Sequence, residues 1–220
     1  MRRSVFILLL VFIAGCTSVP FQDTARVSLD SVDPKSVVEQ FKATLPGSFQ
    51  LLSTVVFEYN GRTFPGLGTV DINRTDRIFK LACMNAMGVK LFELSGDARA
   101  TKTHYALAAL TQYGDIGTAV GIDIRRIYFD LVPSPDALLW RRTKQLHYRQ
   151  FSGPGFIEFV FAGAYGDLIA KRYYEDNQLA WEVLYYEYRD QLGKRFPQGI
   201  VFINYQNGYR LTVRQKELYS

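Results

Sequence analysis

Alternation of apolar and polar residues runs through most of the chain and predicts β-strands. The clearest example begins at Phe79 and ends at Leu94. Phe79, Leu81 and Cys83 share one face of a first strand, and Phe92 and Leu94 share one face of a second. This pattern is typical of a β-hairpin with a single apolar face.

The turn of this hairpin, Asn85-Ala86-Met87-Gly88, carries an apolar residue where polar residues are usual. Gly88 can adopt a positive φ and so allows a tight turn. Two interpretations of Met87 remain open from the residues alone. Either the tip folds back onto a neighbouring element, or Met87 projects from the domain and touches lipid.

The same alternation predicts nine further strands, which brings the total to about eleven. Turn signals such as Asn60-Gly61 and Asn207-Gly208 separate several of them. Strands this numerous, each with one apolar face, close into a barrel or curl into a half-barrel. The nine predicted ranges are 49–59, 66–73, 103–110, 145–151, 156–162, 168–174, 179–189, 199–206 and 209–216.

Helical spacing of apolar residues appears in two places. Asp33 and Pro34 are suited to the N-cap and first position of a helix that ends before Pro46, with Val37 and Phe41 on its apolar face. A second helix is predicted between 114 and 131, followed by a short helical turn over 136–141.

The mid-chain helix has two possible roles. It either plugs one end of a barrel or forms a lid over a cavity. Gly117 and Gly121 weaken it as an isolated helix, which is compatible with movement.

The first residues have the pattern of a targeting segment. Arg2 and Arg3 precede an apolar run that is too short to span a bilayer. The run ends at Ile13-Ala14-Gly15-Cys16, which resembles the bacterial lipoprotein box. The resemblance implies a signal peptide over 1–15, acylation of Cys16, a flexible lipidated tether over 16–32 and one domain over 33–220. An ordinary secretory signal, or an uncleaved anchor with a chance cysteine, is the alternative.

Charge and cysteine content narrow the classes of function. Without Arg2 and Arg3, 24 basic residues face 21 acidic ones, and no basic run supports nucleic-acid binding. Once Cys16 is acylated, Cys83 has no partner for an intrachain disulfide, so we expect it to be inert core.

No residue set supports catalysis or metal binding. The sequence has no HExxH, GxSxG, P-loop or complete GxGxxG motif. Its two histidines, His104 and His147, fall on separate predicted strands, where a lone histidine is usually a surface or satisfied residue. We therefore expect no catalytic residue, no metal, no cofactor and no enzymatic activity.

Several short motifs follow one another along the chain. They are Asn85-Ala86-Met87-Gly88 with Phe92-Glu93-Leu94, then Leu131-Val132-Pro133, Trp181-Glu182-Val183 with Tyr185, and Pro197, Ile200, Asn207-Gly208 and Arg210–Arg214. In this order they resemble the LolA/LolB lipoprotein-carrier family, nearer the LolB side. The resemblance covers most of residues 35–217, although Ala86 and Met87 replace a proline and a leucine of the family pattern.

The resemblance implies a mainly β fold: an incomplete antiparallel barrel of about eleven strands, with helices covering its apolar mouth. It also implies an outer-membrane lipoprotein, anchored on the periplasmic face, that binds acylated lipoproteins or other lipids and helps to insert them. A periplasmic LolA-type carrier would be its partner, and Met87 would correspond to a protruding leucine associated with insertion. A structural or assembly lipoprotein that uses the same fold as a scaffold is the alternative.

Strand parity predicts which side chains line the apolar cavity. A register slip of one residue would invert a whole strand, so these assignments depend on the pairing. The predicted lining residues are Leu51, Phe57, Phe79, Leu81, Phe92, Leu94, Phe159, Trp181 and Tyr185.

Overall fold

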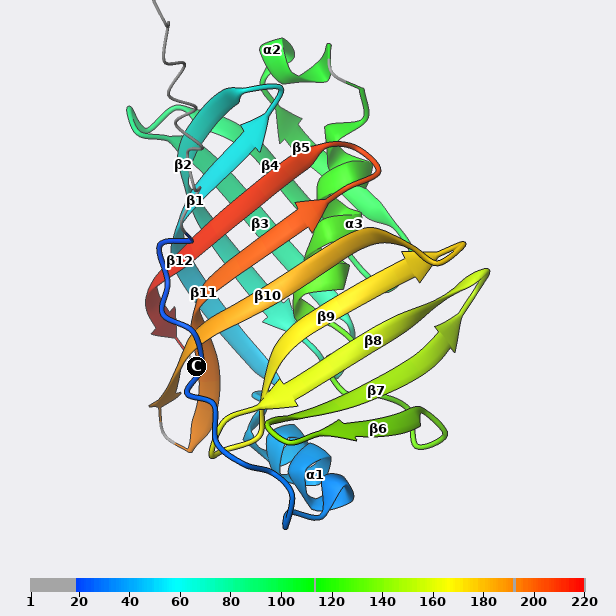
Figure 1. Cartoon of the computed structure of the whole chain (residues 1–220). Helices are drawn as coiled ribbons and strands as arrows, with labels where there is room; N and C mark the ends of the chain where they lie inside the picture. The colour runs from blue at the N-terminus through cyan, green and yellow to red at the C-terminus, as the bar shows by residue number, and fades with distance from the viewer. Residues whose placement is uncertain (1–18, 113, 192, 220) are drawn as a thin grey trace, which may run out of the picture.

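The computed structural model describes residues 19–112, 114–191 and 193–219, and in them one long antiparallel sheet curls around a buried core (Figure 1). Within these residues there are twelve strands and three helices. The helices are α1 (Pro34–Thr44), α2 (Ala108–Thr111) and α3 (Ile116–Tyr128). The strands are β1 (Ser48–Tyr59), β2 (Arg62–Asn73), β3 (Ile78–Asn85), β4 (Lys90–Gly96), β5 (Thr101–Ala106), β6 (Leu138–Arg142), β7 (Gln145–Ser152), β8 (Gly155–Ala162), β9 (Asp167–Glu175), β10 (Gln178–Gln191), β11 (Lys194–Asn204) and β12 (Tyr209–Tyr219).

The sheet order explains why the barrel is incomplete. The strands follow the order β5-β4-β3-β2-β1-β12-β11-β10-β9-β8-β7-β6, so β1 pairs with β12 and joins the two halves of the chain. β5 and β6 are the two free edges. The connection between them carries α2 and α3, and α3 lies across the concave side against β4 and β5 (Figure 1). The predicted mainly β, incomplete barrel is thus confirmed.

Helix α1 forms where the sequence predicts it. Asp33 accepts hydrogen bonds from the backbone N–H groups of Lys35 and Ser36, which would otherwise lack partners at the helix start. Val37 and Phe41 on its apolar face are buried, and α1 packs at the lower end of the sheet in Figure 1.

Two predicted elements were wrong. Residues 136–141, expected as a helical turn, contribute to the additional strand β6, because Leu138–Arg142 pairs with residues of β7 across a short hairpin. The fifth strand ends at Ala106 rather than at 110, because Ala108–Thr111 forms helix α2.

Residues 19–32 differ from the free polar tether that the sequence suggests. Phe21 is buried, its ring stacks on Tyr186 with centroids 5.5 Å apart, and Arg214 donates to the Pro20 carbonyl at 2.7 Å. A side chain at Gly199 would collide with the Phe21 ring, so this glycine makes the close approach possible. The segment is a strap along the outside of the sheet.

The strap continues to the hairpin between β6 and β7. Leu29 is buried, and its N–H donates to the Thr143 carbonyl at 2.9 Å. The Arg141 guanidinium donates to the carbonyls of Leu29 at 3.1 Å and Val32 at 3.0 Å. Two buried apolar residues and these bonds outweigh the polar composition of the segment.

Candidate functional site: the apolar interior under helix α3

The predicted lining residues point to the concave side of the sheet, and most belong to the buried core. Leu81 packs against this core, whereas Phe57 and Phe92 are partly buried. The buried members of the predicted set are Leu51, Phe79, Leu94, Phe159, Trp181 and Tyr185.

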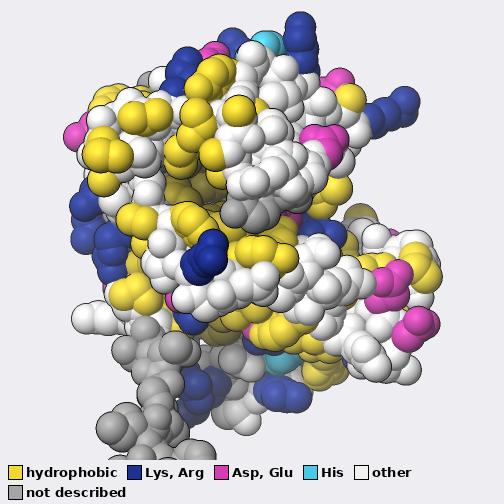
Figure 2. All heavy atoms as spheres, turned by 90° about the horizontal axis from the view of Figure 1, so that it is seen from above, with side chains coloured by type: hydrophobic (Ala, Val, Ile, Leu, Met, Phe, Trp, Pro, Cys, Tyr) yellow, Lys and Arg dark blue, Asp and Glu magenta, His cyan; other side chains and the backbone are white. Residues whose placement is uncertain are grey.

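Phe57 marks the upper end of the interior. Its ring lies 5.4 Å from Tyr209 of β12 and 6.2 Å from Phe64 of β2. Figure 2, which views the molecule from above, shows hydrophobic side chains gathered around a hollow on this face. This end is the candidate mouth.

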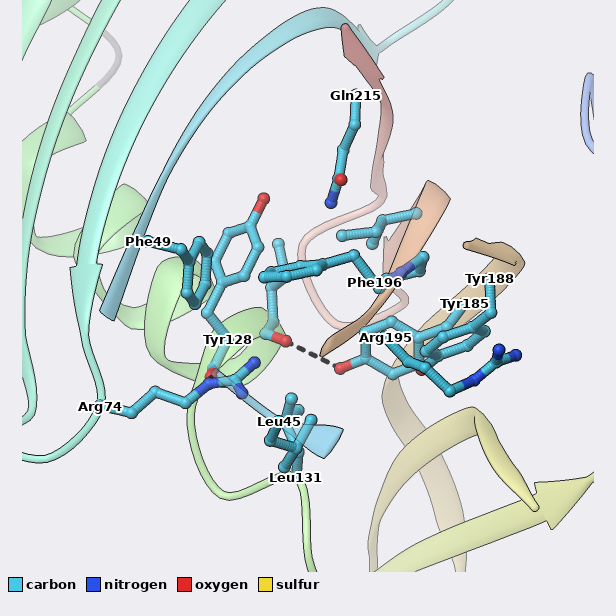
Figure 3. A pocket seen from close by; sticks show the side chains of 13 residues that line it. Leu45, Phe49, Arg74, Tyr128, Leu131, Tyr185, Tyr188, Arg195, Phe196 and Gln215 are labelled. Atoms are coloured by element: carbon cyan, nitrogen blue, oxygen red, sulfur yellow. Dashed lines mark hydrogen bonds between the residues drawn. The ribbon is translucent and has the colours of Figure 1, made fainter. Parts of the chain in front are cut away.

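The lower end of the interior is filled by side chains. A cavity between α1, the end of α3 and strands β10–β12 has room for about one water molecule (Figure 3). The residues around it include Phe49, Tyr128, Tyr185, Tyr188 and Phe196. The structure therefore contains no preformed acyl-sized space at this base, within the described residues.

Three side chains hold the last carbonyls of α3. Lys171 on β9 donates to the Arg126 carbonyl at 3.1 Å and to the Phe129 carbonyl at 2.8 Å. The Tyr185 hydroxyl donates to the Ile127 carbonyl at 2.8 Å.

Arg74, directly after β2 in the turn to β3, completes this set, because its Nε donates to the Tyr128 carbonyl at 3.1 Å. Helix-terminal carbonyls lack partners within the helix, and cations there also interact favourably with the helix dipole. The C-terminal end of α3 is thus fixed to the β2–β3 turn, β9 and β10.

Burial shifts the pKa values of the two cationic side chains at this helix end, Lys171 and Arg74. Desolvation lowers the pKa of Lys171 to about 8 and that of Arg74 to about 10. At neutral pH both remain charged, and Lys171 contacts the ring faces of Phe159 and Trp181 at about 6.0 and 5.9 Å.

An acidic residue on the inner face of α3 makes a second connection to the sheet. Asp123 is buried, accepts a hydrogen bond from the Tyr209 hydroxyl of β12, and pairs with Arg126 at 3.3 Å. Burial raises the pKa of Asp123 to about 6, although both partners oppose the shift. The Arg126 guanidinium also lies 5.1 Å from the centroid of the Trp181 ring.

Two glycines allow α3 to lie directly on the edge strand β5. A Cβ on Gly117 would lie within 2.1 Å of the Thr103 hydroxyl, and one on Gly121 within 1.9 Å of the Thr101 hydroxyl. The glycines that weaken the helix in isolation therefore have a packing role in the folded protein.

The hairpin tips beside the mouth carry exposed apolar residues. Met87 is 83% exposed, so its side chain does not fold back onto a neighbouring element. Asn85 shapes this turn: its side-chain oxygen accepts from the N–H groups of Met87 and Val89, each at 3.0 Å. Phe64, 46% exposed, projects from the adjacent β1–β2 hairpin.

Neither histidine belongs to a metal-binding cluster within the described residues. His147 is buried on β7, 3.2 Å from Glu158 and 3.1 Å from Gln145. His104 lies 2.7 Å from Ser95 on the neighbouring strand. Desolvation raises the pKa of the buried Cys83 thiol to about 11, so Cys83 is a poor nucleophile.

The sequence did not identify Asp123, Arg74 or Lys171 as interior residues. A signal was present for Asp123, because it interrupts the apolar stripe of the predicted helix. Cys16 lies outside the described residues. Among residues 19–112, 114–191 and 193–219, no helix is both long and apolar enough to cross a bilayer.

Comparison with known proteins supports the fold and leaves the family of the sequence open. No protein-family profile and no curated protein sequence matches the chain significantly. Among solved structures, a LolA superfamily protein, NE2245 from Nitrosomonas europaea, matches with a TM-score of 0.54 and 9% identity over 86% of this chain and 93% of that one.

Two further structures match over similar lengths. A putative outer membrane lipoprotein-sorting protein domain from Vibrio parahaemolyticus has a TM-score of 0.50 at 11% identity, over 84% of this chain and 90% of that one. A DUF1329 family protein from Desulfovibrio piger has a TM-score of 0.52 at 7% identity, with the same coverage. The chain thus has a LolA/LolB-like fold.

Proposed function

We propose that this protein is a lipid-anchored carrier that binds acylated lipoproteins, or other acyl lipids, in its half-barrel and transfers them to the membrane. One observation carries the proposal: the concave apolar face of an open sheet lies under a single helix, with exposed apolar hairpin tips beside its mouth. The protein would act without catalysis or a cofactor, at the periplasmic face of a bacterial outer membrane. A periplasmic LolA-type carrier would supply its cargo.

Burial of acyl chains would drive binding. Each CH₂ group removed from water contributes about 0.8 kcal/mol. Since the base is filled, chains would enter at the mouth beside Phe57 and Phe92, and deeper entry would require α3 to shift. Its C-terminal end is held by Lys171, Arg74 and Tyr185, so we expect its N-terminal end to move away from β5.

The anchor and the hairpin tip would have separate roles. Two acyl chains on Cys16 suffice for stable attachment. Insertion of Met87 into lipid contributes only about 1.5–3 kcal/mol, which is too little to anchor the protein but enough to keep the mouth at the bilayer.

A scaffold function is the second candidate, and the filled base favours it. A half-barrel whose space is occupied by its own aromatic side chains could serve assembly without lipid transfer.

Mass spectrometry of the gently extracted full-length protein separates the two candidates. A carrier should retain acyl species beyond those of its own anchor, and its depletion should mislocalise other lipoproteins. A Cys16→Ala variant provides the control, because any acyl chains that it retains cannot belong to the anchor. A protein free of additional acyl chains, with normal lipoprotein localisation after depletion, would favour the scaffold.

A further inference from the structure

The strap crosses the outer face of the sheet in a definite direction. The N–H of Gln22 donates to the Glu187 carboxylate of β10 at 3.0 Å. The Phe21 ring lies over Gly199 of β11. Arg214 of β12 donates to the carbonyl of the residue before Phe21, and its guanidinium carbon lies 4.6 Å from the centroid of the Phe21 ring. Toward its N-terminal end the strap therefore passes from β10 over β11 to β12 (Figure 1).

This docking shortens the connection to the proposed anchor. Cys16 precedes Pro20 by four residues. A fully extended chain of that length spans about 14 Å, so an acylated Cys16 cannot lie further than this from Pro20 on the outer face. If the chain were free as far as Leu29, the same bound would be about 45 Å. With the strap docked, a bilayer that holds the acyl chains must lie close to the outer face of β12.

The ladder row at which the strap ends continues onto β1, β2 and β3. Residues opposite one another in an antiparallel ladder lie on the same face, so the whole row is on the outer side of the sheet. From β10 to β3 its members are Tyr186, Gly199, Arg214, Thr54, Leu67 and Met84. The strap thus ends in line with an apolar part of the outer face.

Four side chains form this apolar part, which we call the outer patch: Val56, Pro65, Leu67 and Met84. Val56 and Pro65 are opposite each other in the ladder, and Leu67 and Met84 form the neighbouring pair. Pro65 is exposed, and the other three are partly exposed. The outer patch is continuous with the hairpin tip, because Met84 lies at the end of β3 that leads into the turn of Met87.

Two ion pairs border the outer patch. Arg210 lies 3.8 Å from Glu58 on one side, and Lys90 lies 2.6 Å from Glu93 on the other. The pairs add no net charge to the border. Apolar contact rather than charge would therefore hold the outer patch at a bilayer, and anionic lipid is not required.

We infer that the outer patch lies against the bilayer when the protein is anchored, and that the docked strap holds it there. The inference rests on the proposed function, through its acyl anchor and its tip at Met87, and adds the orientation of the domain. The half-barrel would lie on its β1–β3 side, so that tip and outer patch contact lipid together. A tip alone would leave the domain free to rotate about a single contact.

Quenching of a fluorescent label tests this orientation in the lipidated full-length protein, reconstituted in phosphatidylcholine vesicles. The label is placed at Pro65→Cys in the outer patch, or at Leu138→Cys on β6, at the other end of the sheet. The parent protein, whose Cys83 is buried, reports background labelling. A lipid-borne quencher should reduce the fluorescence at position 65 at least about twofold, because an apolar face at a bilayer lies at the boundary of headgroups and acyl chains. The fluorescence at position 138 should change little.

Two changes that lengthen the tether test the role of the strap. An insertion of about ten Gly and Ser residues after Thr17 adds flexible chain without altering the docked strap, and Phe21→Ala removes the ring that docks it. Each should reduce the lipid quenching at position 65 while the protein stays on the vesicles, because a longer tether lowers the effective concentration of the outer patch at the bilayer. Unchanged quenching with the inserted residues would overturn the role of the strap.

The outcomes separate the orientation from the proposed function. If iodide in the water quenches the label at position 65 and the lipid-borne quencher does not, the orientation is overturned and the carrier function stands. Shielding from both quenchers would show that a protein surface, such as a second copy, covers the outer patch instead. Equal lipid quenching at positions 65 and 138 would likewise overturn a preferred orientation. Failure of the full-length protein to attach to vesicles would count against the acyl anchor of the proposed function itself.

Discussion

Met87 is a large apolar side chain in full contact with solvent at a turn. The hydrogen bonds that the Asn85 side chain accepts from the N–H groups of Met87 and Val89 hold the tip in place without any contribution from the methionine side chain. Its exposure of 83% therefore points to a role outside folding.

Met87→Glu should separate stability from function. The free energy of unfolding should change by no more than about ±0.5 kcal/mol, as at other exposed sites. Cargo should still bind, but delivery to liposomes should fail, because a carboxylate resists entry into lipid. Thermal unfolding and a lipoprotein transfer assay measure the two effects.

Phe151→Glu is a matched control for Met87→Glu. Phe151 is 72% exposed and lies near the turn of the β7–β8 hairpin, away from the β3–β4 tip. Its substitution should leave transfer unchanged. Loss of transfer in both variants, or a drop of many degrees in Tm for Met87→Glu, would contradict the role of the tip.

Cys16 gives a prediction on localisation. Cys16→Ala should move the protein to the soluble fraction or leave the signal peptide uncleaved, because the acylated side chain is absent. Cell fractionation with N-terminal sequencing measures this. A processed Cys16→Ala protein that stays in the membrane fraction would rule out the acyl anchor.

Helix α3 shows how one element combines a fixed end with a titratable contact. Asp123 lies on its inner face, and burial raises the pKa of its carboxyl to about 6, against an ordinary value of 3.8. An acid with a raised pKa binds its proton more tightly in the folded protein. The free energy of unfolding therefore falls as pH rises from about 4 to about 6.

Asp123→Asn should remove this contribution. Relative to the parent protein, the variant should gain on the order of 3 kcal/mol in stability between pH 4 and pH 7, because a shift of one pKa unit corresponds to about 1.4 kcal/mol. Denaturant unfolding at the two pH values measures the difference.

Asp130→Asn provides a control of opposite sign. The hydrogen bonds from Arg77 hold the pKa of Asp130 below its ordinary value, so its contribution is lost as pH falls. The destabilisation by Asp130→Asn should therefore be nearly the same at pH 7 and pH 4, and should shrink only well below pH 4, where the parent carboxyl becomes protonated too. If Asp123→Asn behaves in the same way, the carboxyl is not destabilised by burial.

The sequence predicted elements with strong periodicity and missed those that depend on tertiary contact. The hairpin around Met87, helix α1 and most strands follow from residue order alone. Strand β6 does not, because the short run Leu138–Arg142 becomes a strand only when β7 pairs with it. The strap over 19–32 was missed for the same reason, since the partners of Phe21 lie more than 160 residues away.

The partners of a buried charge such as Lys171 cannot be predicted from the sequence, for a related reason. The alternation around Lys171 shows which face it occupies, but the carbonyls that accept its hydrogen bonds come from α3, about 40 residues earlier. Strand parity placed the aromatic lining residues on the concave side, yet it could not show that their side chains fill the base.

At the scale of the whole molecule, the proposed function gives a ligand one route. The apolar interior has a mouth beside the hairpin tips and a base that its own side chains fill. Because the base is closed by packing, a carrier of this shape would begin to bind an acyl chain among the partly buried residues at the mouth. Phe92 is such a residue: it is partly buried and lies near the start of β4, opposite Cys83 and close to the β3–β4 turn.

Phe92→Glu should therefore weaken binding of an apolar fluorescent probe without unfolding the protein. A carboxylate at the mouth must either be desolvated when an acyl chain enters or keep water in its path, and both effects oppose binding. We expect affinity to fall at least about tenfold, which corresponds to about 1.4 kcal/mol. Ile78→Glu is the matched control, because Ile78 is 44% exposed on the neighbouring strand β3, beside the buried Phe79. Unchanged probe affinity in a folded Phe92→Glu protein would place the binding site elsewhere, and an equal loss in Ile78→Glu would show a general effect of charge.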